Sequence, residues 1–513
     1  MAERTIIPGP PGTGKTFRLL NHYMKQEISE RKTDTKKIIY ITFSKAAAKE
    51  AEGRIEELFP GVELKYVSTM HAMGAKETKI NTKDKLLKGI SQWNQFKLYE
   101  PRAKSLNVRS ALDEFSGQTR YEDPILQVRN YAISKKITLE EAAVQCGYIA
   151  WNNIDLAHQI DASLKKYKEA TGMIEFHDMI TKFIDRIKTD ETFFSSDVVF
   201  LDEAQDLNPL QWEMFFAIEK KSKRSYIAGD DDQTIYGFQG AEPEIFINLK
   251  GTLDPQEESR RVPKLVHNVA TDILSRIGVR REKKWKPSDE EGEVHRNVRI
   301  EDIDFTKQNW MILGKTNKLA MLAADYLYHK GYRYDSKSSE HLPKDNLKAY
   351  RTWVNLNNGS SVDTKDVKTM YSFLKVKKNH IERGFSSGKS FQNLYTVNID
   401  ELKSSHGLLV SGDWNQLDFS DEIKDYMAHL IKQGDDLMQE SRIEITTIHQ
   451  SKGRECENVV LFCDFGHEEA ASFLYSQYEK KPDETHRLFF VGTTRAKQRL
   501  FILQPETPYS YDI

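Results

Sequence analysis

The stretch that decides the fold is Gly9-Pro10-Pro11-Gly12-Thr13-Gly14-Lys15-Thr16, which fits the pattern G-x-x-x-x-G-K-[ST]. It follows the strand-like residues 5–7 and precedes a helical pattern of apolar residues over 19–24. Strand, loop and helix in this order are the context that a phosphate-binding P-loop requires. Its glycines let backbone N–H groups converge on phosphate oxygens, Lys15 neutralises phosphate charge, and the Thr16 hydroxyl binds Mg²⁺. The stretch therefore predicts a nucleotide site.

A second motif, at residues 198–206, is an apolar run that ends in acids, as a buried parallel strand would. Asp202 is expected to hold Mg²⁺, directly or through water. Glu203 is expected to orient or deprotonate the water that attacks the γ-phosphate. An acidic pair after a strand can also be a solvated strand end, but the P-loop upstream favours the catalytic interpretation.

A third strand and loop, residues 226–233, ends in Gln233. If its strand is a neighbour of the other two, the amide lies beside both sites and is suited to sense the γ-phosphate or the attacking water. The three motifs together predict hydrolysis of a nucleoside triphosphate.

The second and third motifs, together with the residues that follow them, resemble motifs of the UvrD/Rep branch of superfamily 1 DNA helicases. The residues that carry this resemblance are Asp-Glu-Ala-Gln-Asp at 202–206 and Gly-Asp-Asp-Asp-Gln-Thr-Ile-Tyr-Gly-Phe-Gln-Gly-Ala at 229–241. Other stretches resemble further family motifs in the family's order: 41–47 (Ia), 68–72 (Ib), 259–263 (IV), 445–455 (V) and 491–496 (VI).

The resemblance implies an α/β fold of two RecA-like P-loop NTPase lobes, each a parallel sheet flanked by helices, with two inserted accessory domains. The expected division is lobe 1A at 1–74 and 172–257, a mainly helical domain 1B at 75–171, lobe 2A at 258–332 and 439–513, and a 2B-like domain at 333–438. In 1B, Thr138 and Glu141 form the pattern of a capping box, and Ile160, Leu164 and Tyr167 share one helical face.

The resemblance also implies that ATP and Mg²⁺ lie between the lobes. The expected catalytic residues are Lys15, Asp202, Glu203 and Gln233 of the first lobe, with Arg261 and Arg495 reaching across from the second. The residues expected to bind the nucleotide are Gly9, Pro10, Gly12, Thr13, Gly14, Lys15, Thr16, Arg260, Arg261, Gly453, Glu455 and Arg495. Thr16 and Asp202 would hold the metal.

Single-stranded DNA is the implied partner, alone or at junctions with duplex, gripped by base stacking and phosphate contacts. The expected contacts are Thr42, Phe43, Thr69, His71, Tyr236, Phe238, Thr447 and His449. Phe238 matches the position at which the family usually has a base-stacking Trp. RNA stays open as a substrate, because stacking and phosphate contacts discriminate weakly.

Several positions depart from the family pattern. Eight residues precede Gly9, which leaves no room for the family's adenine-reading Gln motif, and Arg260 replaces an adenine-stacking Tyr. Both changes predict relaxed preference among ATP, GTP and CTP. Gln239 replaces an Arg near the γ-phosphate, which predicts weaker coupling of DNA binding to hydrolysis. The compact chain favours a viral or mobile-element source.

Composition narrows the class of protein. The chain has 513 residues, enough for several domains, and a net charge of −2, so any nucleic-acid site must be a local feature. No apolar run approaches the roughly 20 residues of a membrane span, and the first residues do not resemble a signal peptide. The three cysteines, Cys146, Cys456 and Cys463, are too few and too scattered for a disulfide framework or a four-ligand zinc site. A cytoplasmic protein, nucleoid-associated or viral, is expected.

These observations favour an ATP-dependent helicase that moves 3′-to-5′ and unwinds duplex DNA, with the polarity implied by resemblance alone. Two alternatives stay open. One is a translocase that strips proteins from single strands without efficient unwinding. The other is a nucleic-acid-sensing ATPase subunit of a defence or repair complex, which would require a protein partner. A protein partner from a replication, repair or defence complex is possible in either case.

Overall fold

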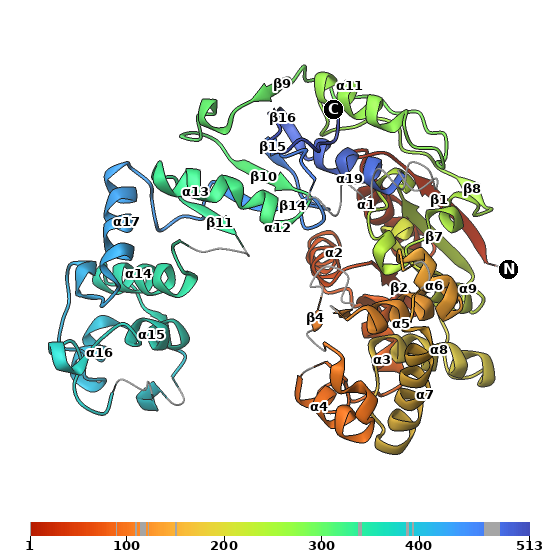
Figure 1. Ribbon diagram of the computed structural model, residues 1–513, viewed down its shortest axis with the longest axis horizontal. Coiled ribbons are helices and arrows are strands. Elements are labelled where there is room, and N and C mark those ends of the chain that lie inside the picture. The colour runs from red at the N-terminus through yellow and green to blue at the C-terminus, as the bar shows by residue number, and fades with distance from the viewer. Residues whose placement is uncertain are drawn as a thin grey trace.

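The computed structural model describes residues 2–88, 90–107, 110–112, 119–121, 123–148, 151–336, 341–385, 389–391, 394–465 and 483–513. These residues form two six-stranded parallel sheets flanked by helices, and two mainly helical insertions. Figure 1 shows an arch, with the first sheet and first insertion on the right, the second sheet at the top and the second insertion on the left. The predicted α/β class with two lobes is confirmed.

The first sheet has the strand order β3-β2-β6-β7-β1-β8, with every pairing parallel. Its strands are β1 (Glu3–Pro8), β2 (Ile38–Ile41), β3 (Tyr66–Ser68), β6 (Val198–Leu201), β7 (Arg224–Gly229) and β8 (Thr252–Leu253). β2 and β6 are buried throughout, as unbroken apolar runs predict. Because β7 lies between β6 and β1, the loops after these three strands meet at one edge. The strand neighbourhood that the Gln233 prediction required is present.

Helices cover both faces of this sheet. They are α1 (Lys15–Arg18), continued by a π-helical segment (Leu19–Met24), α2 (Lys45–Leu58), α3 (Met70–Glu77), α8 (Phe176–Thr189), α9 (Pro209–Glu219) and α10 (Pro243–Ile247). α2 begins where the Ala47 amide donates to the Ser44 hydroxyl at 3.1 Å, and α9 begins with a capping box between Asn208 and Gln211. These caps start each helix close to the end of a strand and leave only short loops at the sheet edge.

The second sheet has the order β11-β14-β10-β15-β16-β9, again all parallel. Its strands are β9 (Glu293–Val298), β10 (Trp310–Gly314), β11 (Tyr334–Ser336), β14 (Ile443–Thr447), β15 (Cys456–Leu461) and β16 (Ala496–Leu503), with helices α11 (Lys264–Leu274), α12 (Asn317–Ala320), α13 (Leu322–His329) and α19 (Asp483–Thr493). The sequence analysis ended the first segment of lobe 2A at residue 332. In the structure β11, at 334–336, pairs with β14 and so belongs to the second sheet. The rest of the domain division stays a prediction.

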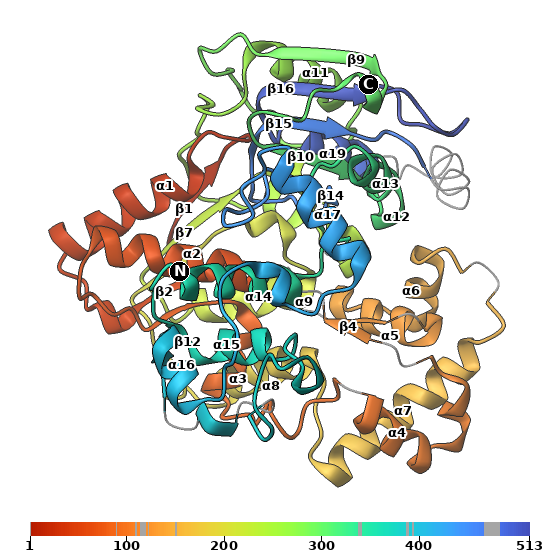
Figure 2. The same cartoon turned by 90° about the vertical axis from the view of Figure 1, so that its left-hand side faces the viewer.

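The first insertion contains α4 (Ile90–Tyr99), α5 (Pro124–Lys135), α6 (Leu139–Gln145), α7 (Ile154–Thr171) and the antiparallel pair β4 (Ser110–Leu112) and β5 (Thr119–Tyr121). Ile160, Leu164 and Tyr167 are buried in its core, and Thr138 and Glu141 form the predicted capping box. α4 and α7 lie side by side in both views (Figures 1 and 2). The insertion therefore has a hydrophobic core of its own.

The second insertion contains α14 (Lys344–Asn357), α15 (Thr364–Tyr371), α16 (Ile399–Ser405), α17 (Asp421–Lys432) and the antiparallel pair β12 (Val362–Asp363) and β13 (Thr396–Val397). Its core is built around Trp353, Tyr371 and Met427. Among the described residues, none of the helices has both the length and the apolar character that crossing a membrane needs.

Candidate functional site

The loop between β1 and α1 is a tight cradle closed by the second lobe. Gly12 and Gly14 have φ of 77° and 82°, in the left-handed region that favours glycine. A Cβ on Gly12 would lie 2.5 Å from Ser259 Oγ and 2.7 Å from Arg261 Cβ. A side chain at Gly12 is thus excluded by its backbone conformation and by the close packing of Ser259 and Arg261. Glycines of this kind are typical of a loop that binds phosphate through its backbone N–H groups.

Lys15 lies inside this cradle. Its Nζ donates to the Gly9 carbonyl oxygen at 2.7 Å, and the Thr13 hydroxyl donates to the Pro10 carbonyl oxygen at 2.8 Å. Burial lowers the pKa of Lys15, against the opposing effect of nearby carboxylates. The cation is therefore held where an anionic ligand would stabilise it.

Thr16 and Asp202 meet at the carboxyl end of β6. The Thr16 hydroxyl donates to Asp202 Oδ2 at 2.7 Å, and the Tyr40 hydroxyl donates to the same oxygen at 2.8 Å. Burial, then the neighbouring Glu203, raises the pKa of Asp202. Mg²⁺ in nucleotide sites takes one or two protein oxygens and keeps several waters, so this oxygen pair fits the ion.

Glu203 has φ 55° and ψ 40°, a left-handed conformation that costs a non-glycine residue about 1 kcal/mol. This conformation places its carboxylate beside Gln205, whose Nε2 donates to it at 2.6 Å. Burial would raise the pKa of Glu203, but the charges of Lys452 and Lys15 hold it below its ordinary value. An ionised carboxylate next to the P-loop can accept a proton from water.

Gln233 contacts residues of both lobes. Its Nε2 donates to Asp230 Oδ2 at 2.7 Å, and its Oε1 accepts from Arg495 Nη2 at 3.0 Å. Lys452 of the second lobe donates to the Gln233 carbonyl oxygen at 2.7 Å and pairs with Asp206 at 2.5 Å. The structure therefore brings the predicted sensor and the predicted trans-acting arginine into direct contact.

Arg495 is a buried cation at the interface between the two lobes. It is 1% exposed, and its described hydrogen-bond partners are all uncharged oxygens, from Gln233, Val491, Arg454 and Thr494. Burial lowers the pKa of Arg495. The carboxylates of Glu203, Glu455 and Asp230 act on it from a distance and oppose this shift. A buried cation with no anion among its described hydrogen-bond partners is preorganised for an anionic ligand.

The predicted motif IV residues lie against the P-loop. The Ser259 hydroxyl donates to the Pro11 carbonyl oxygen and the Arg260 amide donates to that of Gly12, both at 2.9 Å. Arg261 Nη1 donates to Glu455 Oε2 at 3.3 Å. Its Nε is buried with no hydrogen-bond partner among the described residues. A phosphate beside the cradle could accept the hydrogen bond that this nitrogen leaves unmade.

Two neighbours of the site escaped sequence analysis. The guanidinium of Arg260 lies 5.4 Å from the ring centroid of Phe17, which follows Thr16 and is 52% exposed. Tyr40 sits in the apolar run of β2 and resembles a core residue in the sequence. Its hydroxyl contact with Asp202 is visible only in the structure.

Gly453, a predicted nucleotide-binding residue, has φ 81° and lies two residues before Glu455. The turn at this position therefore depends on glycine.

The predicted DNA contacts divide into buried and exposed groups. Tyr236 packs against Phe43 at 4.8 Å between ring centroids, and both rings are buried. Phe238 is 41% exposed and meets His449 edge-on at 5.5 Å. Among the three predicted aromatic contacts, Phe238 therefore has the ring that is most available for stacking, and Tyr236 and His449 pack against it. Its role in DNA binding stays a prediction.

The remaining predicted contacts follow strand ends. Thr42 Oγ1 is buried with no described hydrogen-bond partner, whereas Thr69 and Thr447 accept backbone hydrogen bonds as local caps. His71 is buried against Phe176, and this burial lowers the pKa of His71 to about 4. Thr69 and Thr447 thus have structural roles as caps, whereas no such role is seen for the Thr42 hydroxyl. The DNA contacts of all these residues stay a prediction.

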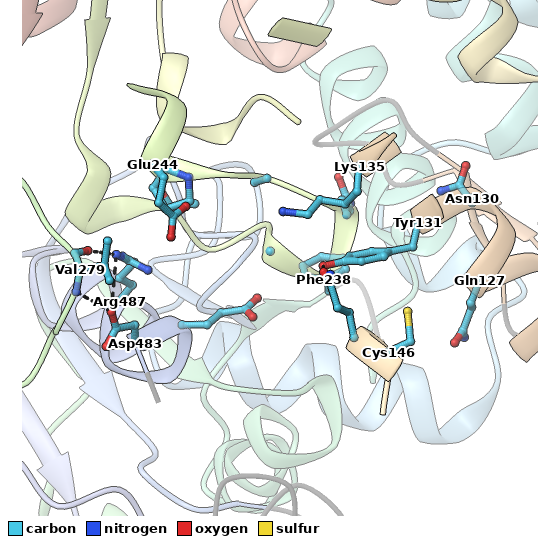
Figure 3. Close-up of a pocket in the computed structure, with 17 residues that line it drawn as sticks. Gln127, Asn130, Tyr131, Lys135, Cys146, Phe238, Glu244, Val279, Asp483 and Arg487 are labelled. Atoms are coloured by element: carbon cyan, nitrogen blue, oxygen red, sulfur yellow. Dashed lines mark hydrogen bonds and ion pairs between the residues drawn. The ribbon is translucent and has the colours of Figure 1, made fainter. Parts of the chain in front are cut away.

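Phe238 also lines a cavity of about 510 Å³ between the first insertion and the second lobe. Figure 3 shows Tyr131 and Lys135 of α5 on one side and Asp483 and Arg487 of α19 on the other. Residues of both lobes and the first insertion therefore line the space next to Phe238.

Comparisons with known proteins agree with this geometry. The UvrD/REP helicase N-terminal domain family matches residues 1–254, and the UvrD-like helicase C-terminal domain family matches residues 303–507. A probable DNA helicase II homolog of Mycoplasma genitalium is 22% identical, over 97% of this chain and 82% of that protein. The ATP-dependent DNA helicase PcrA of Bacillus subtilis is 22% identical, over 73% of this chain and 51% of that protein.

This chain thus matches about half the length of PcrA. The solved complex of arterivirus nonstructural protein 10 (helicase) with DNA aligns over 99% of this chain and 62% of that chain, with 10% identity and a TM-score of 0.34. The first match covers the first sheet with the P-loop, Asp202, Glu203 and Gln233, and the second covers β10 to β16 with Lys452 and Arg495. Motif IV and β9 lie between the two matched ranges. The chain belongs to the UvrD/REP helicase family.

Proposed function

We propose that this chain is a DNA-dependent ATPase and helicase that moves 3′-to-5′ along single-stranded DNA and unwinds duplex at junctions, in replication, recombination or repair. The observation that carries the proposal is the contact of Arg495 and Lys452 with Gln233 and Asp206. These side chains join the two lobes at the place where the γ-phosphate of ATP would lie.

Hydrolysis follows from the residues at this interface. The P-loop backbone and Lys15 bind the β- and γ-phosphates, and Glu203 takes a proton from the attacking water. Arg495 and Arg261 stabilise the charge that develops on the phosphate oxygens. A magnesium ion held by Thr16 and Asp202 would neutralise charge between the phosphates.

Movement follows because one loop carries both the sensor and the stacking ring. Gln233 and Phe238 belong to the same short segment after β7. Loss of the γ-phosphate removes an anion that holds the second lobe against Gln233, so the interface opens and the grip of Phe238 changes with it. Alternate opening and closure yields stepping along one strand.

Strand displacement tests the helicase part of the proposal. We expect ATP-dependent separation of a duplex with a 3′ single-stranded tail and little separation of one with a 5′ tail. Displacement of a bound protein without strand separation would favour the translocase. Failure of both, with ATP hydrolysis intact, would favour a sensing subunit and call for co-purification of its partner.

Phe238→Ala should weaken binding to single-stranded DNA. Stacking on one base contributes about 1–3 kcal/mol, which corresponds to roughly 5- to 150-fold in Kd. Fluorescence anisotropy of a labelled oligonucleotide measures the change. Phe238→Trp should retain affinity, and Leu98→Ala, an exposed apolar residue of α4, is the control. Equal affinity of Phe238→Ala and wild type would remove this ring from the DNA path.

Relaxed base preference is expected from Arg260 and Phe17, because a guanidinium and a ring contact the π-face that every base offers. We expect kcat/KM for ATP, GTP and CTP to agree within roughly tenfold. Arg260→Ala should raise KM for all three by a similar factor, about 2- to 30-fold. A hydrolysis panel measures both, and strict use of ATP would contradict the prediction.

A further inference from the structure

A cluster of buried charges lies next to Gln233, here called the Lys283 cluster: Lys283, Arg280 and Asp230, Asp231 and Asp232. The three aspartates follow β7 and are 0% exposed. Lys283 Nζ lies 2.6 Å from Asp230 Oδ1, 2.6 Å from Asp231 Oδ1 and 2.9 Å from Asp232 Oδ2. Arg280 forms a fork with both oxygens of Asp232, at 2.8 and 2.7 Å. Two cations from the segment after α11 thus face three buried carboxylates.

The two carboxylate oxygens of Asp230 bind different groups, one in the Lys283 cluster and one in the predicted nucleotide site. Its Oδ1 accepts from Lys283, while its Oδ2 accepts from Gln233 Nε2 at 2.7 Å. The other end of the same amide accepts from Arg495 at 3.0 Å. The orientation of the Gln233 amide therefore depends on an Asp230 carboxylate that is ionised and fixed in place.

Lys283 keeps the Asp230 carboxylate both ionised and fixed in place. Burial alone would lower the pKa of Lys283, but the three aspartates hold it above its ordinary value. Burial would raise the pKa of Asp230, and the charges of Lys283 and Lys15 hold it below its ordinary value. Without Lys283, a buried Asp230 would lose a direct counter-charge and would be driven to take up a proton or to turn.

We propose that Lys283 is a positioning residue for hydrolysis, acting through Asp230 to fix the Gln233 amide between Asp230 and Arg495. This inference rests on the proposed ATPase function. Lys283 would not touch the nucleotide, and its contribution would appear in the chemical step. Arg280 pairs with Asp232 alone, so it shares the cluster but has no direct contact with Asp230.

Two charge-balanced double variants separate positioning from general stability. Lys283→Met/Asp231→Asn and Arg280→Met/Asp232→Asn each remove one cation and one anion from the same buried cluster. The first removes the partner of Asp230, whereas the second leaves it. We expect the first to lower kcat by about 10- to 100-fold, because misplacing a catalytic group by about 1 Å has an effect of that size. KM for ATP should stay within about twofold, since the P-loop is untouched.

The second double variant should keep kcat close to wild type, and Lys283→Arg should restore most of the activity. Adding Gln233→Ala to the first double variant should cost no more than Gln233→Ala alone, because both act through one group. Thermal melting compares the folded stability of the two pairs. If the Lys283 pair does not fold, Asp230→Asn leaves Lys283 paired with Asp231 and Asp232 and should lower kcat by a similar factor.

Equal loss of kcat in the two double variants, or unchanged kcat in the Lys283 pair or in Asp230→Asn, would overturn the positioning role. The ATPase proposal is tested separately by the wild type and Glu203→Gln. Suppose that the wild type hydrolyses ATP and Glu203→Gln does not. An unchanged kcat in Lys283→Met/Asp231→Asn would then overturn only the positioning role of Lys283 and leave the ATPase proposal standing. A wild type without activity would overturn both.

Discussion

Glu203→Gln should reduce the rate of ATP hydrolysis by about 10²- to 10⁴-fold, the usual contribution of a positioned general base. The carboxylate is placed by a left-handed backbone conformation and oriented by Gln205 at 2.6 Å. The amide keeps the size and the hydrogen bond but cannot take a proton. Phosphate release at saturating ATP measures the effect.

Binding should survive the same substitution. ATP binding, followed with a fluorescent analogue, should stay within about threefold of wild type, because the P-loop and Lys15 are intact. Glu191→Gln, on the exposed surface, is the matched control. Retained hydrolysis in Glu203→Gln would move the base to another carboxylate, with Asp202 and Asp206 as the nearest alternatives.

Arg495→Ala should lower kcat by about 10³-fold or more, the effect of removing an arginine that stabilises transition-state charge. The guanidinium is buried among uncharged partners and contacts the Gln233 amide from the opposite lobe. Its loss removes both charge stabilisation and the contact that reports nucleotide state. DNA affinity should change much less, because Phe238 keeps its neighbours.

Arg495→Lys should be intermediate, since a lysine keeps the charge but cannot hold Gln233 and the carbonyl oxygens of Val491 and Arg454 at once. Arg499→Ala, on the strand β16 that begins directly after Arg495, is the control for folding. Single-turnover hydrolysis with ATP prebound separates the chemical step from binding. A rate for Arg495→Ala close to wild type would remove the residue from the reaction.

The sequence was sufficient for the parts of the site in which local pattern determines structure. Gly12 and Gly14 require left-handed backbone, and the apolar run before Asp202 folds as a buried strand. Both could be recognised without coordinates. The placement of Gln233 beside them needed one further fact, that β7 lies between β6 and β1, which only the pairing of strands could supply.

Other features depend on packing that sequence patterns do not encode. Tyr40 and Phe17 both look like core residues, yet one bonds Asp202 and the other is exposed beside Arg260. Phe43 is the reverse case, an expected stacking residue whose ring is buried. The three residues of β11 are too few to show a strand period and are recognised only by their pairing with β14.

Charged contacts between distant segments were the least predictable. Lys283 and Asp230 are far apart in the chain, and a run of basic residues at 280–284 is typical of a solvated surface. Their pairing emerges only when the segment after α11 folds against the loop after β7. Sequence reasoning therefore found the groups that would touch the nucleotide and missed a group that would position one of them.

The measurement that tests the central claim most directly is ATP hydrolysis by the wild type with and without single-stranded DNA, at matched low salt. The account predicts that DNA raises the rate by about tenfold or more, because the stacking ring and the γ-phosphate sensor share one loop. Hydrolysis that is indifferent to both DNA and RNA would contradict it.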